Sequence, residues 1–148
     1  MKAGRLNAYE AAPEAMRAVQ RVEGYIQQCG LEKSLIELVK MRASQINGCA
    51  YCLHVHSSDA RRAGETEQRL YLLDAWHEST LYTERERAAL AWTEALTRVS
   101  ETHAPDVIYD EVRRHFADKE LVDLTTLIGL INLRNRLAIG FRYEHPVT

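Results

Sequence analysis

The chain has 148 residues, of which 46% are hydrophobic and 27% are charged, and its formal net charge at pH 7 is -2. This size predicts one domain over residues 1–148. The near-neutral charge excludes a generally basic surface, and without Lys/Arg clusters among aromatic residues no nucleic-acid binding is expected. The longest apolar run, within residues 127–133, is far too short to span a bilayer, so no membrane association is expected. With only three cysteines and no apolar signal-peptide core, a cytoplasmic protein is predicted.

The N-terminal part of the sequence predicts an extended arm followed by two helices. Residues 1–12 are expected to form the arm. The helix over residues 13–30 begins with a proline suited to a first turn and ends with a glycine suited to a left-handed cap. A second helix is expected from residue 31 or 33 to residue 46, with Glu37 near its apolar seam.

After a cysteine-containing helix, described below, the remaining predicted elements are a short helix over residues 66–76, a turn over 77–81, and helices over 83–100, from Pro105, and over 119–139. Thr83 and Glu86 match a capping box, in which each side chain bonds the backbone amide of the other residue. Asp118 is expected to cap the last helix.

The last predicted helix is apolar on more than one side, which indicates a central helix or one shared with another subunit. No alternating β pattern and no internal repeat is present. We therefore expect an all-α, single-domain fold of about seven helices. Cys29, at the end of the first helix, is expected to be a small buried hydrophobic residue.

Residues 37–56 combine two cysteines three positions apart, a histidine four positions beyond the second, and an upstream glutamate. An Asn-Gly pair interrupts the preceding helical pattern, so a new helix is expected over residues 49–63, with both cysteines in or just before its first turn. A thiol loses its proton most readily at such a helix start. At about 100° per residue, Cys49, Cys52 and His56 share one face of the helix.

Other sites are compatible with the same stretch. Two thiolates and an imidazole are three of the four ligands of a structural zinc ion, with His54, Glu37 or a distant residue as the fourth, although no second Cys/His pair is present. Leu53 excludes a c-type haem motif, and a thioredoxin-like motif requires a β-α-β context. Simple packing of the cysteines would leave a buried histidine and carboxylate unexplained.

The pattern Glu-x11-Cys-x2-Cys-x3-His resembles that of the AhpD-like alkylhydroperoxidases, within the carboxymuconolactone decarboxylase superfamily. Its members in this sequence are Glu37, Cys49, Cys52 and His56. Three flanking segments, residues 40–48, 59–64 and 86–96, also resemble the short, single-domain members. The resemblance covers most of the chain in order and implies an AhpD-like helical fold.

The resemblance implies a thiol-dependent peroxidase that reduces organic hydroperoxides. It assigns Cys52 as the peroxidatic thiolate and Cys49 as the resolving thiol, with His56 as the proton-transfer group and Glu37 as the general base. A sulfenic acid at Cys52 would condense with Cys49 to a disulfide, which an external dithiol, a protein-bound lipoyl group among the family's reductants, would reduce. No bound cofactor and no metal ion is expected.

Tyr51 occupies a position that well-described family members fill with histidine, immediately before the second cysteine. A phenol with an ordinary pKa of about 10 does not relay protons near neutrality, so the relay is expected to depend on His56 and Glu37. His54 is turned about 200° from Cys52 and His56 and is expected on the surface or in a subunit contact.

The resemblance also implies a homo-oligomer, because the family forms trimers and hexamers. Two other functions remain alternatives: a zinc-binding structural or interaction protein, and a carboxymuconolactone decarboxylase-type enzyme. The decarboxylases of the superfamily act on a lactone ring without the cysteine pair, so the presence of both cysteines favours the peroxidase.

Overall fold

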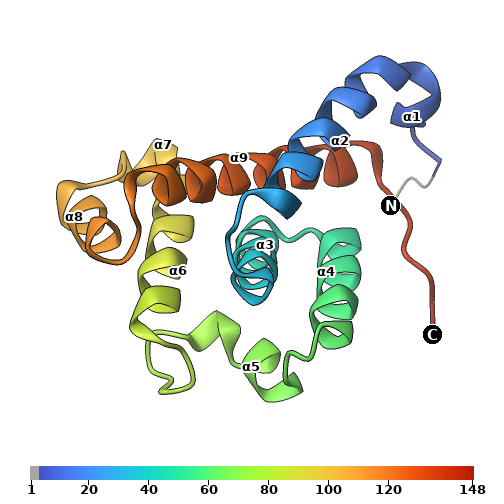
Figure 1. The fold of residues 1–148 in the computed structure, drawn as a ribbon. Coiled ribbons are helices and arrows are strands. Elements are labelled where there is room, and N and C mark those ends of the chain that lie inside the picture. The colour runs from blue at the N-terminus through green and yellow to red at the C-terminus, as the bar shows by residue number, and fades with distance from the viewer. Residues whose placement is uncertain (1–3) are drawn as a thin grey trace.

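The computed structural model describes residues 4–148, and this part of the chain is all-helical (Figure 1). Its elements are α1 (Ala8–Ala11), α2 (Pro13–Gln28), α3 (Lys33–Asn47), α4 (Ala50–Arg62), α5 (Glu67–Tyr71), the 3₁₀ helix η1 (Leu73–Ala75), α6 (Glu84–Thr97), α7 (Val99–Thr102), α8 (Asp106–His115) and α9 (Asp118–Phe141). The predicted all-α class is confirmed. Residues 4–148 form nine α-helices where about seven were expected, because two four-residue helices, α1 and α7, were not anticipated.

Within residues 4–148, no helix combines the length and the apolar character that crossing a membrane requires.

Helix α3 lies at the centre of the fold, and the view in Figure 1 looks almost along its axis. It packs against α4 on one side, α6 on the other, and α9, which runs across both. Nine consecutive or near-consecutive residues of α3 are buried, among them Lys40, Arg42 and Ser44. A helix that is enclosed on every side holds its polar side chains away from water, so each of them needs a partner inside the protein.

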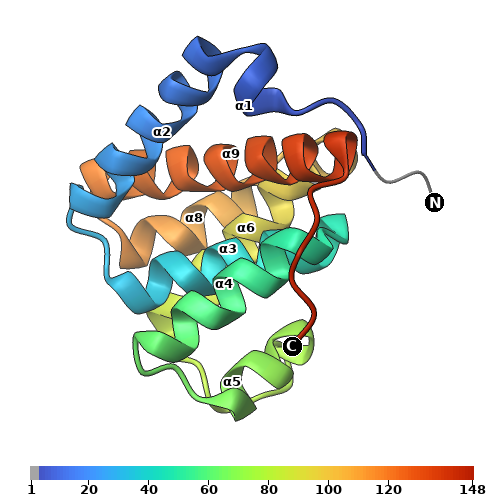
Figure 2. The ribbon, with the colours of Figure 1, turned by 90° about the vertical axis from the view of Figure 1, so that its right-hand side faces the viewer.

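Two hydrophobic clusters lie on either side of α3. One joins α3 to α2, α6, α8 and α9, with Ile36, Val39, Leu124 and Ile128 among its buried members. The other joins α3 to α4, α5 and α6 through residues such as Leu38, Leu73 and Leu90. Helix α2 crosses over α9 and carries α1 at its far end (Figure 2). The two clusters therefore fix the positions of α3, α4 and α9 relative to one another, and α2 packs over α9 from outside.

The expected extended arm over residues 1–12 is wrong in part. Residues 8–11 form α1, because the Asn7 side chain accepts the backbone amides of Tyr9 and Glu10 and so caps a short helix. The four residues of α1 are too few to show apolar periodicity, so the sequence pattern did not predict a helix there. Residues 1–3 of the expected arm lie outside the residues that the structure describes.

Three helix ends also differ from the expected ones. The helix capped by Thr66 stops at Tyr71 and continues as η1, and α6 stops at Thr97, before the separate turn of α7. The capping box of Thr83 and Glu86 is confirmed. Asp118 does not cap α9: Ala117 is the N-cap residue, and its amide donates to the Glu120 carboxylate at 2.9 Å.

Cys29 is half-buried, not enclosed as expected, and its thiol donates to the Ile26 carbonyl at 3.1 Å. The final helix is central, as predicted: α9 contacts α2, α3, α4, α6 and α8. It nevertheless leaves Val122 and Leu133 exposed. After α9 the chain leaves helical structure and runs down beside α4 (Figure 2).

Candidate active site

Helices α3 and α4 meet at a tight turn that places both cysteines. Gly48 ends α3 with φ +68°, a left-handed conformation that favours glycine, and the amide of Cys49 donates to the Ser44 carbonyl at 3.0 Å. Cys49 is the N-cap residue of α4, and Cys52 lies in the first turn of that helix. The helix start predicted from the Asn-Gly pair is therefore confirmed.

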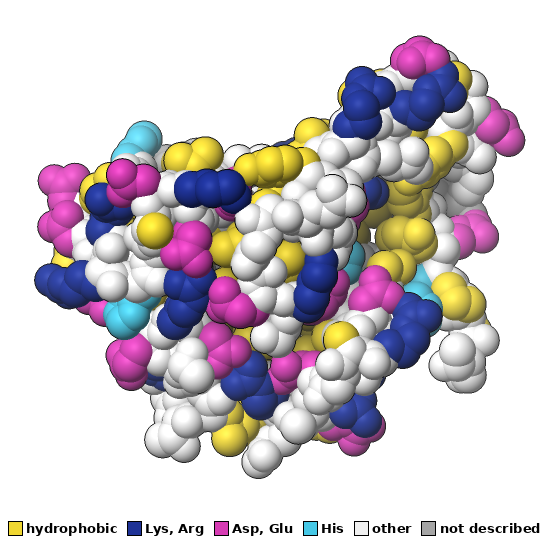
Figure 3. Space-filling model, viewed as in Figure 1, with side chains coloured by type: hydrophobic (Ala, Val, Ile, Leu, Met, Phe, Trp, Pro, Cys, Tyr) yellow, Lys and Arg dark blue, Asp and Glu magenta, His cyan; other side chains and the backbone are white. Residues whose placement is uncertain are grey.

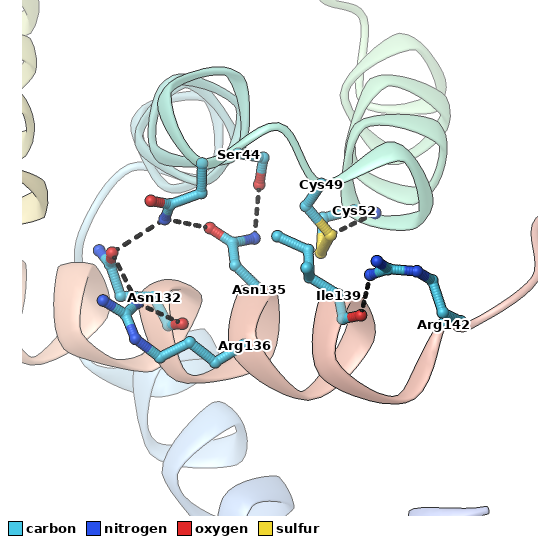
Figure 4. Close-up of a disulfide and its surroundings, with 9 residues drawn as sticks. Ser44, Cys49, Cys52, Asn132, Asn135, Arg136, Ile139 and Arg142 are labelled. Carbon is cyan, nitrogen blue, oxygen red and sulfur yellow. Dashed lines mark hydrogen bonds between the residues drawn. A yellow bond between two sulfur atoms is a disulfide. The ribbon is translucent and has the colours of Figure 1, made fainter. Parts of the chain in front are cut away.

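The sulfur atoms of Cys49 and Cys52 lie at bonding distance from each other and form a disulfide (Figure 4). The Cys49 sulfur also accepts the backbone amide of Cys52 at 3.3 Å. Both residues are buried, 1% and 3% exposed, and they pack against Ala138 and Ile139 of α9. Because an amide at the positive end of α4 points at the sulfur pair, negative charge is stabilised there.

A network of amide side chains fixes the end of α3 to α9 beside the cysteines (Figure 4). Asn47 donates to the side-chain oxygens of Asn132 and Asn135, at 3.0 and 2.9 Å, and Asn135 donates to the Ser44 hydroxyl at 3.0 Å. Asn132 also donates to Thr97 of α6 at 3.1 Å. Because these polar groups are mutually satisfied in the interior, they orient the turn that carries Cys49.

Glu37 of α3 and His56 of α4 face each other one helical turn beyond Cys52. The Glu37 Oε2 and His56 Nδ1 atoms lie 3.3 Å apart. Both atoms are buried, and neither has a hydrogen-bond partner among residues 4–148, so the contact has ion-pair distance without hydrogen-bond alignment. The two residues that the sequence pattern placed on separate helices are thus brought together by the packing of α3 against α4.

A cavity of about 430 Å³ opens beside this pair, beneath α2. Its apolar wall consists of Tyr9, Met16, Val19, Tyr51, Val55, Leu137, Ala138 and Tyr143, and its polar wall of Glu23, Gln27, Glu37, Lys40, His56, Asp59 and Arg134. Cys52 lines the cavity, whereas Cys49 does not. Hydrophobic side chains gather in a hollow under the α1–α2 end of the molecule in Figure 3. The expected single face thus presents Cys52 and His56 to the cavity, with Cys49 behind them.

Tyr51 and His54, the other reactive side chains of α4, point in different directions. The Tyr51 ring lies on the cavity wall, 5.3 Å from the Tyr143 ring and perpendicular to it. The His54 ring lies 5.8 Å from that of His145 in the C-terminal segment and does not line the cavity. His54 is therefore turned away from the cysteines, as its helical angle predicts.

A largely buried ion cluster joins α2, on one side of the cavity, to α3 and α9 on the other. Lys40 is 2% exposed, and its ammonium group donates to Glu23 of α2 at 2.6 Å. Arg134 of α9 lies 3.8 Å from the same carboxylate. Burial by itself raises the pKa of Glu23, but the hydrogen bond from Lys40 and the charges of Lys40 and Arg134 outweigh it, so the pKa is lowered from 4.5. The carboxylate therefore stays charged and holds α2 in place.

We expect Lys40→Met to lower the free energy of unfolding by about 2–4 kcal/mol, because it leaves the largely buried Glu23 carboxylate with the more distant Arg134 as its charged partner and a long hydrogen bond from Gln27. Urea unfolding with the exposed Lys33→Met as control measures this. The Glu23→Gln/Lys40→Met double variant should regain part of the loss. Since the folded pKa of Glu23 is lowered, its contribution is present above pH 4.5 and is lost as pH falls through the folded value. With Glu23→Gln, the free energy of unfolding should therefore fall less steeply below pH 4.5 than it does in the unchanged protein. The same pH dependence in both proteins would contradict the assignment.

Comparison with known proteins decides the family. Residues 13–95 match the carboxymuconolactone decarboxylase family. The chain is also 44% identical over 136 residues to the uncharacterized protein YdfG of Bacillus subtilis, covering 92% of each chain. The chain belongs to the carboxymuconolactone decarboxylase family. This family member is therefore related to proteins whose activities are themselves unassigned.

Solved structures show that this carboxymuconolactone decarboxylase family member has an AhpD-like fold. A protein of unknown function from Agrobacterium tumefaciens, for which an antioxidant defence role and the name AhpD are suggested, superposes with a TM-score of 0.95 at 49% identity, covering 97% of this chain and 99% of the other. The debrominase Bmp8 is similar in fold, with a TM-score of 0.84 at 22% identity, over 93% of this chain and 74% of that one.

Several residues at the site of this family member were not singled out by their chemistry in the sequence. Glu23, Lys40, Asp59 and Arg134 all line the cavity, yet each lies in an ordinary helical pattern. A lysine at position 40 among the inward positions of α3 was the one available signal, because a buried ammonium group requires a partner.

Proposed function

We propose that this protein is a thiol-dependent peroxidase that reduces organic hydroperoxides with the Cys49–Cys52 pair. The observation that carries this proposal is the placement of Cys52 on the cavity wall beside His56 and Glu37, with the Cys49 sulfur at bonding distance behind it. A substrate in the cavity can reach Cys52, while the resolving thiol is protected from it. The family membership and the AhpD-like fold support the same chemistry.

In the first step, the Cys52 thiolate attacks one oxygen of the hydroperoxide. The O–O bond breaks, an S–O bond forms, the sulfur is oxidised to a sulfenic acid, and the alkoxide leaves as the alcohol after taking a proton. His56 lies one turn along α4 from Cys52 and on the same cavity, so it accepts the thiol proton and supplies the leaving group's proton. The helix N-terminus stabilises the thiolate.

In the second step, the Cys49 thiolate attacks the Cys52 sulfur. The disulfide forms and the sulfenic oxygen leaves as water after gaining a proton. Glu37 acts as the base that starts this step, taking the Cys49 proton through His56 or a water molecule, because its carboxylate lies 3.3 Å from the imidazole. Tyr51 contributes a wall of the cavity and no proton transfer, in keeping with its edge-on contact to Tyr143.

The cycle closes when an external dithiol reduces the disulfide, returning two thiols and leaving the dithiol oxidised. Both cysteines are almost fully buried, so a folded protein surface cannot reach either sulfur directly. A dithiol on a slender arm can enter the cavity and attack Cys52. A protein-bound lipoyl group, the reductant that the family resemblance implies, has this shape.

The cavity also supports an organic substrate over hydrogen peroxide. Aliphatic and aromatic side chains, among them Met16, Val19, Leu137 and three tyrosines, form about half of its wall. Burial of an alkyl or aryl group there contributes roughly 0.8 kcal/mol per CH₂, which hydrogen peroxide cannot gain. Organic hydroperoxides are therefore expected to give the higher kcat/KM.

Treating the reduced protein with one equivalent of cumene hydroperoxide tests the proposal. Peptide mapping should find the Cys49–Cys52 bridge and one equivalent of alcohol, and dihydrolipoamide should sustain turnover. Metal analysis of the purified protein distinguishes the peroxidase from a zinc-binding structural protein. Near-stoichiometric zinc bound by both thiols, in a protein that does not consume peroxide, would favour the structural role. Peroxide consumption that does not change the thiols would contradict the proposal.

We also propose that the protein acts in the cytoplasm as a homo-oligomer, a trimer or hexamer. The low cysteine content supports the compartment. The exposed apolar residues Val122 and Leu133 of the central helix α9 support an interface with another subunit. Sedimentation equilibrium determines the number of subunits.

A further inference from the structure

A third polar side chain joins Glu37 and His56 on the cavity wall and has no part in the peroxidase steps. Asp59 follows His56 by three positions on α4, so both side chains leave the same face of the helix. One carboxylate oxygen from each acid and one imidazole nitrogen all lie within 4.8 Å of one another. Two facing helices thus direct three potential metal ligands toward one point of the cavity.

The pair of unpartnered atoms at this point has the separation that a metal ion imposes. Two ligands of a tetrahedral ion at about 2.1 Å each stand about 3.4 Å apart. The Glu37 Oε2 and His56 Nδ1 atoms are 3.3 Å apart, are buried, and bond to no other group among residues 4–148. The His56 side chain is only 9% exposed. A buried nitrogen and a carboxylate oxygen that face each other at ion-pair distance, with no hydrogen bond to any other group, can both bind a shared metal ion.

We propose that Glu37, His56 and Asp59 form a binding site for one divalent transition-metal ion. Two carboxylates and one imidazole are the ligand types that Zn²⁺, Mn²⁺ and Fe²⁺ accept, and they leave positions open on the cavity side. Two negative charges match a dication. The neighbouring Lys40 does not offset them, because it is paired with Glu23.

Asp59 can serve as a ligand without losing its present partner. Its side chain is 40% exposed and pairs with Arg62, whose own side chain is largely in solvent. A carboxylate has two oxygen atoms, so one can keep the exposed arginine while the other turns toward the metal ion. Such an exposed pair contributes little energy and offers little resistance to that rotation.

This site differs from the zinc site that the sequence pattern permits, which uses both thiols. The proposed ligands include neither cysteine, so the site exists while the disulfide is closed. If the peroxidase function proposed above holds, the ion would occupy the carboxylate and the imidazole that move protons. Metal binding would then inhibit turnover, with the oxidised enzyme free to bind the ion between cycles.

The test measures Zn²⁺ binding to the oxidised full-length protein by competition with a chromophoric chelator. We expect one equivalent to bind, and Asp59→Asn to weaken binding at least tenfold, while the exposed Asp110→Asn of α8 binds as the unchanged protein does. The Cys49→Ser/Cys52→Ser variant should bind equally well, because neither sulfur is a proposed ligand. Because no turnover is measured, these results stand whether or not the protein is a peroxidase.

Two results would overturn the metal site: equal affinity in Asp59→Asn and Asp110→Asn, or loss of binding when both cysteines are replaced. His56→Ala provides the second ligand variant, checked by circular dichroism, and should also bind at least tenfold more weakly. Inhibition by Zn²⁺ that a chelator reverses is then measured separately with cumene hydroperoxide. Binding without inhibition would leave the site in place and would contradict the proton relay instead.

Discussion

Replacing Cys52 by serine should abolish peroxide consumption, with a loss of at least about 10³-fold in kcat/KM. Cys52 lines the cavity and Cys49 does not, so only the Cys52 sulfur can meet the O–O bond. A serine side chain has nearly the same shape as a cysteine. Its hydroxyl keeps its proton near neutral pH, whereas the α4 N-terminus stabilises the thiolate of a cysteine. Stopped-flow measurement of peroxide loss with the pre-reduced protein gives the rate directly.

Two cysteine variants provide the controls for this result. Cys49→Ser should consume one equivalent of peroxide and stop, leaving a sulfenic acid at Cys52 that dimedone traps. Cys29→Ser should match the unchanged protein, because that half-buried thiol lies at the end of α2, donates to the Ile26 carbonyl and does not line the cavity. Full turnover in Cys52→Ser with loss in Cys49→Ser would reverse the two assignments.

Replacing Glu37 by glutamine should lower kcat about 10²-fold, within the range of general acid–base contributions. Glutamine keeps the size of the side chain and its position opposite His56, but it cannot take a proton. The residue is assigned to activation of Cys49, so the loss should fall on disulfide formation and not on the first attack by Cys52. Rapid quenching should therefore show a burst of sulfenic acid, followed by slow conversion to the disulfide.

The burst separates a proton-transfer role from a merely structural one. If Glu37 only supports the fold, Glu37→Gln should slow both steps alike and lower the stability to urea. Glu101→Gln, at an exposed position of α7, serves as the matched control and should leave both rates unchanged. A Glu37→Gln protein with an unchanged rate of disulfide formation would exclude the residue from the relay.

The sequence predicted the elements that local rules govern. Thr83 with Glu86 and the glycine at position 48 marked helix ends that the structure has, because caps and left-handed turns depend on neighbouring residues alone. The same rules failed at α1, where Asn7 caps a helix too short to show periodicity, and at Asp118, which is replaced as cap by Ala117 and Glu120. A helix of four residues, or the position of a cap to within one residue, cannot be predicted from so few side chains.

The candidate site divides in the same way. The sequence by itself determined that Cys49, Cys52 and His56 share one face of a helix, since a helical period fixes the angles between residues three, four and seven apart. Only the tertiary structure decided that Cys52 faces the cavity, that Glu37 meets His56 at 3.3 Å, and that Asp59 joins them. Those relations depend on how α3, α4 and α9 pack, and the crossing of helices distant in sequence is set by the whole core and not by any local pattern.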